Sequence, residues 1–350
     1  IELASASGRP MEGLHQGRFR ALGGTTNFWG GQLVKFDEHI FKARDWVSDY
    51  KWPIKYQDIE PYYDLAYKRL GMVDVLNDID VWRSLKIEPP YEFSDVMIHL
   101  TRWLPEPNFA KIFEKKIRES KNLFILLNAN VTSLISENNG RFIDAVSFLN
   151  NLGKNNCLKS RNVILANGTI EIVRLLKLRL DNGHEPVWSK NKWLGVGFMD
   201  HLDCIAGSII PNKKGDFSNI FDNAFVSGIK YSPKLKLSSE AQENEKLLDI
   251  SAHFIFKSSV SENFDNLKIF LRGLSRGKIS KETAKNPIKL IKSMKYALPM
   301  IWRYIRYNRM YNFSDEGILL RLTSEQSPDT TSVITLREDK DKFGVPNIDV

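Results

Sequence analysis

The 350 residues include 42% hydrophobic and 26% charged residues, a balance typical of a soluble globular protein, and no apolar run reaches the roughly 18 residues of a membrane span. Two cysteines, Cys157 and Cys204, are too few for a disulfide framework and lack CxxC spacing, which fits a reducing compartment. The net charge of +8 is unevenly distributed, because residues 267–310 alone carry +11 and leave −3 for the rest.

Local patterns predict the elements of the first half of the chain. The apolar spacing over residues 53–70 predicts a helix that Gly71 ends in a capping position. A second helix is expected over 108–120 and a third over 171–179. Strands are expected over 123–127, 130–135, 141–148 and 162–166.

After about Gly207 the pattern changes to strands, long polar loops and basic helices, which predicts two domains, 1–206 and 207–350. The second contains the basic segment 267–310, where Pro299 should kink or split a helix. A charge run of this kind is most often a solvated helix face. The alternative is a surface for an anionic partner, either a membrane or a charged glycan. No nucleic-acid partner is expected.

The most informative motif is a glycine-rich loop, RFRALGGTTNFWGG, over residues 18–31. Glycines permit positive φ and a close approach of the backbone to a ligand, and the Thr and Asn side chains add hydrogen-bonding groups. A tight structural loop is the alternative interpretation. The candidate ligand-binding residues are Arg20, Gly23, Gly24, Thr25, Thr26, Asn27, Trp29, Gly30 and Gly31.

A second motif lies at a predicted strand–turn–helix junction. The apolar strand 162–166 leads into a turn at Asn167 and Gly168, and a helix is expected to begin with Thr169 as its N-cap and Glu171 in its first turn. Such a junction presents backbone N–H groups and the positive end of a helix to a phosphate.

Five blocks of sequence, taken in order, resemble the glucose-methanol-choline (GMC) oxidoreductases. The similarity is strongest to their bacterial sugar and polyol dehydrogenase branch and to pyranose oxidase. Besides the loop, the blocks are DW…WPIKY…PYY from Asp45, NVILANGTIE from Asn162, LGVGFMDH from Leu194, and EQSP with SVITL from Glu325.

The resemblance implies an α/β (α+β) fold, with a Rossmann-like FAD-binding domain and a mixed-sheet substrate domain. In this family the first βαβ unit would precede Ile1 and the catalytic histidine would follow Val350. We therefore expect an internal fragment that is inactive by itself.

The resemblance also assigns individual residues. It adds Val131, Ala166, Asn167 and Gly168 to the cofactor-binding set, and it places Gln326 on the substrate-facing wall. His201 is a candidate catalytic base, although a structural histidine at a domain junction is favoured over that role. Spacing typical of a metal site is absent from the histidines.

The expected activity is oxidation of a hydroxyl group of a sugar, polyol or other alcohol by hydride transfer to FAD, with an electron acceptor that the sequence does not identify. The FAD should be bound non-covalently, because Phe28 stands where some relatives carry a histidine bonded to the flavin.

Two alternatives stay open: a nicotinamide-dependent dehydrogenase, and a non-catalytic protein that binds anionic or membrane surfaces through residues 267–310. A cytoplasmic location is expected, and an export signal upstream of Ile1 stays open.

Overall fold

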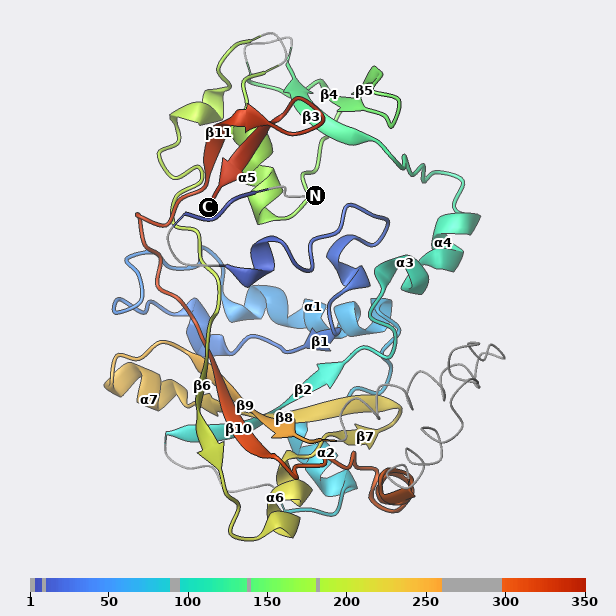
Figure 1. Ribbon diagram of the computed structural model, residues 1–350, viewed down its shortest axis with the longest axis vertical. Helices are drawn as coiled ribbons and strands as arrows, with labels where there is room; N and C mark the ends of the chain where they lie inside the picture. Colours follow the sequence, from blue (N-terminus) through green and yellow to red (C-terminus); the bar gives the residue numbers. More distant parts are fainter. Residues whose placement is uncertain (1–3, 8–10, 89–94, 137–139, 181–182, 260–297) are drawn as a thin grey trace. The chain divides into compact units, whose positions relative to one another are not determined.

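The computed structural model describes residues 4–7, 11–88, 95–136, 140–180, 183–259 and 298–350. The chain forms two compact units (Figure 1). Unit 1 comprises residues 1–29, 108–200 and 327–350, and unit 2 comprises residues 30–107 and 201–326. Each unit is therefore assembled from segments that are distant in sequence.

Unit 1 contains two small antiparallel sheets and one nine-residue helix, α5. Its strands are β3 Asn130–Ile135, β4 Ala145–Leu149, β5 Asn155–Lys159, β11 Thr335–Lys340 and β12 Pro346–Asp349. Its helices are α3 Phe109–Ile112, α4 Glu114–Glu119 and α5 Thr169–Lys177, with short 3-10 turns at Glu12–Leu14, Gly24–Asn27 and Val187–Lys190.

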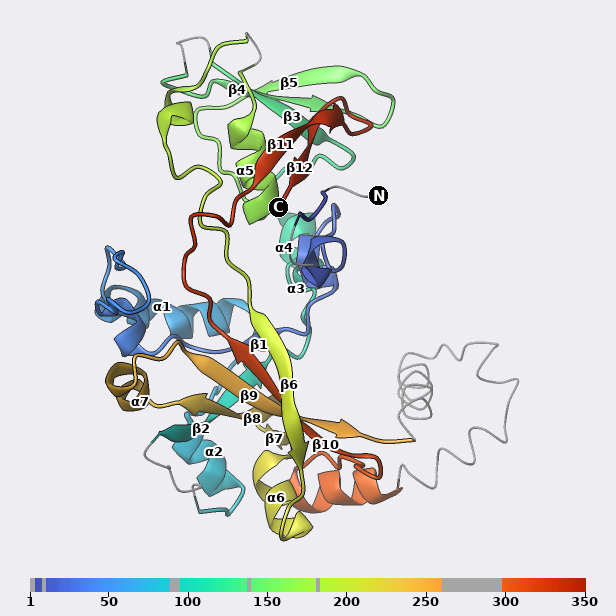
Figure 2. The same cartoon turned by 60° about the vertical axis from the view of Figure 1, so that its left-hand side comes forward.

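Unit 2 is built on a seven-stranded antiparallel sheet in the order β1-β2-β8-β9-β10-β6, with β7 paired to β8 (Figure 2). The strands are β1 Gln32–Leu33, β2 Val96–Trp103, β6 Leu202–Ile209, β7 Ala224–Val226, β8 Ile229–Leu237, β9 Ile250–Lys257 and β10 Gly317–Ser324. The helices are α1 Tyr56–Arg69, α2 Asp78–Ser84, α6 Lys214–Phe221 and α7 Ser239–Asn244, with a 3-10 turn at Glu38–Phe41 and a helical segment over 298–307.

Alternation of apolar and polar residues explains why these strands form a sheet with two different faces. On β9, Phe254 packs against Phe217 and Phe221 of α6, with ring centroids 4.9 and 4.5 Å away. The neighbouring residue His253 points to the opposite face, since successive side chains of a strand alternate. One face therefore carries the apolar core of unit 2, and the other is polar.

Helix α5 connects the two hydrophobic clusters of unit 1. Ile170, in its first turn, belongs to a cluster with Leu14 and Ile348, whereas Leu175, one turn later, packs with Leu134 and β3–β4 residues. The helix thus buries opposite ends against different sheets.

A buried arginine fixes α5 to the β11–β12 hairpin. Arg174 is 3% exposed, and its guanidinium donates to the carbonyls of Val345 and Pro346 and pairs with Asp341 at 2.9 Å. Asp341 also accepts from the backbone N–H of Phe343 at 2.8 Å. Both charges of the pair are thereby hydrogen-bonded away from water, which is the condition for burying them.

The three predicted helices and one of the predicted strands are confirmed, and the strand predicted over 141–148 is confirmed in part, as β4 Ala145–Leu149. The helix predicted over 53–70 is α1, and it ends where Gly71 adopts φ +78°. The predicted helix 108–120 is present, but it breaks at Phe113 into α3 and α4. The strand expected over 130–135 matches β3, and the helix expected over 171–179 begins two residues earlier, as α5.

Two predicted strands are wrong. Residues 123–127 and 162–166 carry strand-type apolar side chains, yet neither segment joins a ladder among the described residues. Their side chains are open to solvent: Phe124 is 85% exposed and Ile164 is 87% exposed. Without a hydrogen-bonding neighbour, a strand-forming sequence has no sheet to join.

The α/β class is confirmed, and two finer expectations differ from the structure. The sheet of unit 2 is antiparallel in every described pairing, which corrects the expected mixed sheet and agrees with its alternating pattern. The predicted boundary at 206/207 divides the chain once. In the structure the chain passes from one unit to the other four times, at 29/30, 107/108, 200/201 and 326/327. Pairing of β2 with β8 requires such an exchange, and composition along the chain does not reveal it.

Replacing Arg174 with Met should destabilise the protein by about 3–5 kcal/mol, because the Asp341 carboxylate would stay buried without its partner. Urea unfolding measures this difference. The control is Arg179→Gln, whose ion pair with Glu185 is exposed and should change stability by less than about 1 kcal/mol. Equal effects of the two substitutions would contradict the account.

Candidate functional site

The N-terminus of α5 is open. Gly168 precedes the helix with φ +81° and ψ 148°, a conformation that glycine alone adopts readily, and an added Cβ there would meet no atom within 4 Å. Gly168 is the N-cap residue, which corrects the expected role of Thr169. No described side chain caps the helix, and no described group accepts from the backbone N–H groups of Thr169, Ile170 or Glu171.

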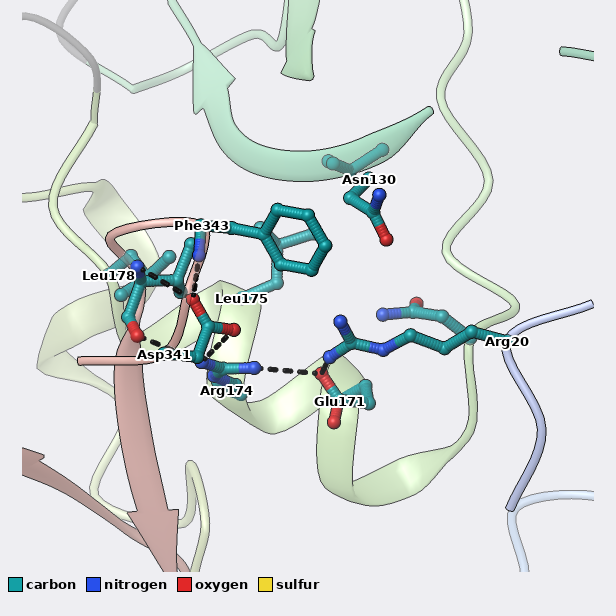
Figure 3. Close-up of a pocket in the computed structure, with 11 residues that line it drawn as sticks. Arg20, Asn130, Glu171, Arg174, Leu175, Leu178, Asp341 and Phe343 are labelled. Carbon is teal, nitrogen blue, oxygen red and sulfur yellow. Dashed lines mark hydrogen bonds and ion pairs between the residues drawn. The ribbon is translucent and has the colours of Figure 1, made fainter. Parts of the chain in front are cut away.

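Glu171, in the first turn of α5, forms ion pairs with three arginines. Its carboxylate accepts from Arg18 at 2.8 Å. It also lies 3.4 Å from both Arg20 and Arg174 (Figure 3). Burial lowers the pKa of Arg18, and the charge of Glu171 opposes this shift. With Asp341 as the second acid, three guanidinium groups stand against two carboxylates, and the balance next to the helix N-terminus is positive.

Two adjoining hollows in unit 1 meet at Arg20, Asn167 and Glu171. The larger, about 260 Å³, lies between the start of α5 and the loop from Arg18 to Thr25. The smaller is closed on its other side by the end of the hairpin, where the Phe343 ring lies over Arg20 at 5.9 Å (Figure 3). Together, the two adjoining hollows are therefore lined by cationic, backbone N–H and aromatic groups.

The structure brings part of the predicted cofactor-binding set together. Arg20, Thr25, Val131, Asn167 and Gly168 all line these hollows, although they come from the glycine-rich loop, β3 and the α5 junction. Ala166 does not line either hollow, and neither do Gly23, Gly24, Thr26, Asn27 or Trp29.

Several residues of the glycine-rich loop instead hold the loop in place. The Thr26 hydroxyl bonds to the carbonyl of Gly23 and accepts from the N–H of Phe109. The Asn27 amide donates to the carbonyl of Gly24 at 2.8 Å and accepts from Asn108. The side chains of Thr26 and Asn27 therefore stabilise the loop, as the interpretation of the motif as a tight structural loop predicts.

Aromatic packing completes the loop. The Trp29 ring meets Phe109 edge-on, with centroids 5.7 Å apart. Gly23 adopts φ +86°, and an added Cβ would come within 3.1 Å of the Asn108 side chain. The glycine is therefore required by close packing against protein.

The remaining predicted site residues belong to unit 2. An added Cβ at Gly30 would lie 2.6 Å from the Trp103 ring, and one at Gly31 would lie 2.8 Å from Pro107, so both glycines permit close packing there. His201 is exposed next to β6, and Gln326 is partly buried at the end of the unit. Neither residue lines the hollows of unit 1.

Sequence reasoning missed the arginine cluster as a site. Arg18 stood in the quoted motif without an assigned role, and Arg174 and Phe343 were not singled out. The spacing of Glu171 and Arg174, three residues apart on one helix, is a local signal for an ion pair. Contact with Arg18 and Asp341 depends on segments more than 150 residues away, for which the sequence offers no local signal.

The described ranges contain no group of three or more His, Cys, Asp or Glu side chains arranged to hold a metal ion. In the same ranges, none of the helices is both long and apolar enough to cross a membrane. No protein-family model matches the chain, and a search of curated proteins found no match.

Replacing Gly168 with Ala should cost about 1–3 kcal/mol, because the backbone conformation and not a clash opposes the side chain. Gly215→Ala is the matched control, since Gly215 also has open space around it but lies in α6 without positive φ. That change should be neutral or stabilising by up to about 1 kcal/mol. Thermal unfolding of both variants provides the comparison, and a harmless Gly168→Ala would show that the junction tolerates another conformation.

Proposed function

We propose that this chain is part of an FAD-dependent oxidoreductase acting on CH–OH groups, of the glucose-methanol-choline type, with a sugar, polyol or other alcohol as substrate. The observation that carries the proposal is that Arg20, Thr25, Val131, Asn167 and Gly168 line two adjoining hollows next to the first turn of α5. These residues were selected by their place in sequence motifs, and the fold brings them to neighbouring positions.

The residues fit the phosphate-bearing part of such a cofactor. Free N–H groups at a helix N-terminus and arginines are the groups that bind phosphate in proteins. At about 260 Å³, the larger hollow lies below the roughly 300–1,000 Å³ of complete small-molecule pockets, so it suits a portion of FAD. Arg18, Arg20 and the amides of α5 would hold that portion, and bound flavin would supply hydride acceptance.

The two unpaired apolar segments support the same proposal. Residues 123–127 and 162–166 precede β3 and α5 directly, and both present exposed strand-type side chains. A nucleotide-binding domain completed by polypeptide outside residues 1–350 would cover these exposed apolar side chains. The Rossmann-like domain therefore stays part of the proposal.

Protein expressed from the complete reading frame that contains these residues should purify yellow, and acid precipitation should release the colour into the supernatant. Release is expected because Phe28, at the position of the covalent histidine in some relatives, has no nucleophilic atom. Arg20→Gln should weaken FAD binding by about tenfold or more, as expected for loss of a charged hydrogen bond.

The control for Arg20→Gln is Arg83→Gln, which removes the same charge from an exposed ion pair on α2. Flavin content, measured from the absorbance of the released cofactor, should be unchanged in that variant. A colourless full-length protein, or equal flavin loss in both variants, would contradict the proposed function.

The helical segment 298–307 supports a second candidate function, binding to an anionic membrane surface. Its outer face presents four apolar side chains at helical spacing: Leu298, Ile301, Trp302 and Ile305. Trp302 is 60% exposed and Ile305 is 76% exposed, whereas Arg303 on the inner face pairs with Asp222. An exposed apolar face beside cationic sequence is typical of helices that lie in a membrane interface. Residues 267–297 of the basic segment lie outside the described residues.

Vesicles of phosphatidylglycerol should therefore bind the protein, and binding should weaken as salt rises from about 0.1 to about 0.5 M, because screening acts on exposed charges. The double variant Trp302→Ala, Ile305→Ser should lose most of this binding, and Lys289→Gln with Lys292→Gln and Lys295→Gln should weaken it. Val73→Ser, at another exposed apolar position, is the control. Binding unaffected by all of these changes would leave the charge run as a solvated helix face.

A further inference from the structure

A row of basic side chains crosses the polar face of the unit 2 sheet. His99 on β2 is the register partner of Lys234 on β8. The pairing of Leu235 with Ala252 places His253 of β9 beside Lys234 on its other side. His253 is in turn the partner of Arg321 on β10. Since cross-strand partners share a face, the four side chains form one continuous row.

Three members of this row, His99, Lys234 and His253, lack partners among the residues that the structure describes. The buried Nε2 of His99 and Nδ1 of His253 make no hydrogen bond, and the Lys234 ammonium group makes neither a hydrogen bond nor an ion pair with any residue that the structure describes. By contrast, Lys236 on the same face pairs with Asp37 at 2.6 Å, and Arg321, the fourth member of the row, pairs with Asp203 at 3.0 Å. The exception is therefore the set of His99, Lys234 and His253.

Burial and mutual repulsion disfavour the charged forms of these side chains, and the carboxylate of Asp203 opposes the pKa shifts of Lys234 and His253. Burial lowers the pKa of His99 to about 4, and it lowers the pKa of Lys234, on which Arg321 acts in the same direction. Burial and the charge of Lys234 likewise lower the pKa of His253. Unsatisfied buried polar groups are rare in folded proteins, and several in one place call for a specific partner.

We propose that this row binds the oxyanion group of a small molecule, a carboxylate or a phosphate, with Lys234 as the charged centre and His99 and His253 as flanking donors. Neighbouring strands lie about 4.8 Å apart, so the backbones of β2 and β9 lie about 10 Å apart on either side of β8, and an oxyanion bound by Lys234 would lie between the two histidines. At the far end of the row, the side chains of Arg321 and Asp203 are 41% and 38% exposed, which leaves that end open to solvent. The inference concerns unit 2 alone and does not depend on the flavin.

Isothermal titration of the protein with gluconate, glucose 6-phosphate and glucose tests the proposal and distinguishes its two sources of oxyanion. At least one of the two anions should bind ten times more tightly than glucose, and the tighter of the two identifies the group. Lys234→Gln should weaken that binding at least tenfold. Lys257→Gln, which removes the same charge from an exposed position at the end of β9, should leave it within twofold.

Nuclear magnetic resonance of the unmodified protein provides a readout that does not depend on how the variants fold. Saturation with the anion should shift the ring signals of His99 and His253, and saturation with glucose should not. Anion affinity no higher than that of glucose, an unchanged affinity in Lys234→Gln, or unshifted histidine signals would each overturn the proposal.

Discussion

The buried contact between Arg174 and the β11–β12 hairpin is the constraint on which the rest of unit 1 depends. Its guanidinium satisfies two hairpin carbonyls and the Asp341 carboxylate, and its neighbour Glu171 on the same helix collects Arg18 and Arg20 from the glycine-rich loop. One helical turn therefore fixes segments from the beginning, middle and end of the chain. The open helix N-terminus lies beside this network, so the same contacts that hold the fold also position the candidate site.

The charge arrangement is compatible both with a stable fold and with the anion binding that we propose for this site. Glu171 neutralises part of the arginine cluster, which would otherwise be strongly self-repelling near the positive end of α5. The cluster keeps a positive balance, and the amides of Thr169 and Ile170 stay without acceptors among the described residues. On the polar face of unit 2, Lys236 and Arg321 are paired with acids, whereas Lys234, His99 and His253 have no partner among the described residues.

Local signals in the sequence were sufficient for much of this fold and for some of the site. The Gly71 cap and the turn at Gly168 that leads into α5 could be predicted because a few adjacent residues determine each of them. The segments 123–127 and 162–166 were predicted as strands and are not, because a strand needs a partner that its own residues do not encode. The same limit applies to the contact of Arg174 with Asp341 and to the pairing of β2 with β8, which join residues over 100 positions apart. Thr26 and Asn27 were predicted to bind a ligand. Their hydrogen bonds to the loop and to Asn108 can be identified only in the folded structure.

The central claim is that the N-terminus of α5 is a phosphate-binding site, and backbone amide shifts measured during titration with ADP test it most directly. The amides of Gly168, Thr169, Ile170 and Glu171 should shift together and saturate, because they are the free donors at the hollow. The first turn of α2 provides the internal reference, since the Asn77 side chain already accepts from the Asp80 amide. Shifts at α5 without shifts at α2 are the predicted result, and an unchanged α5 at saturating ADP would contradict the claim.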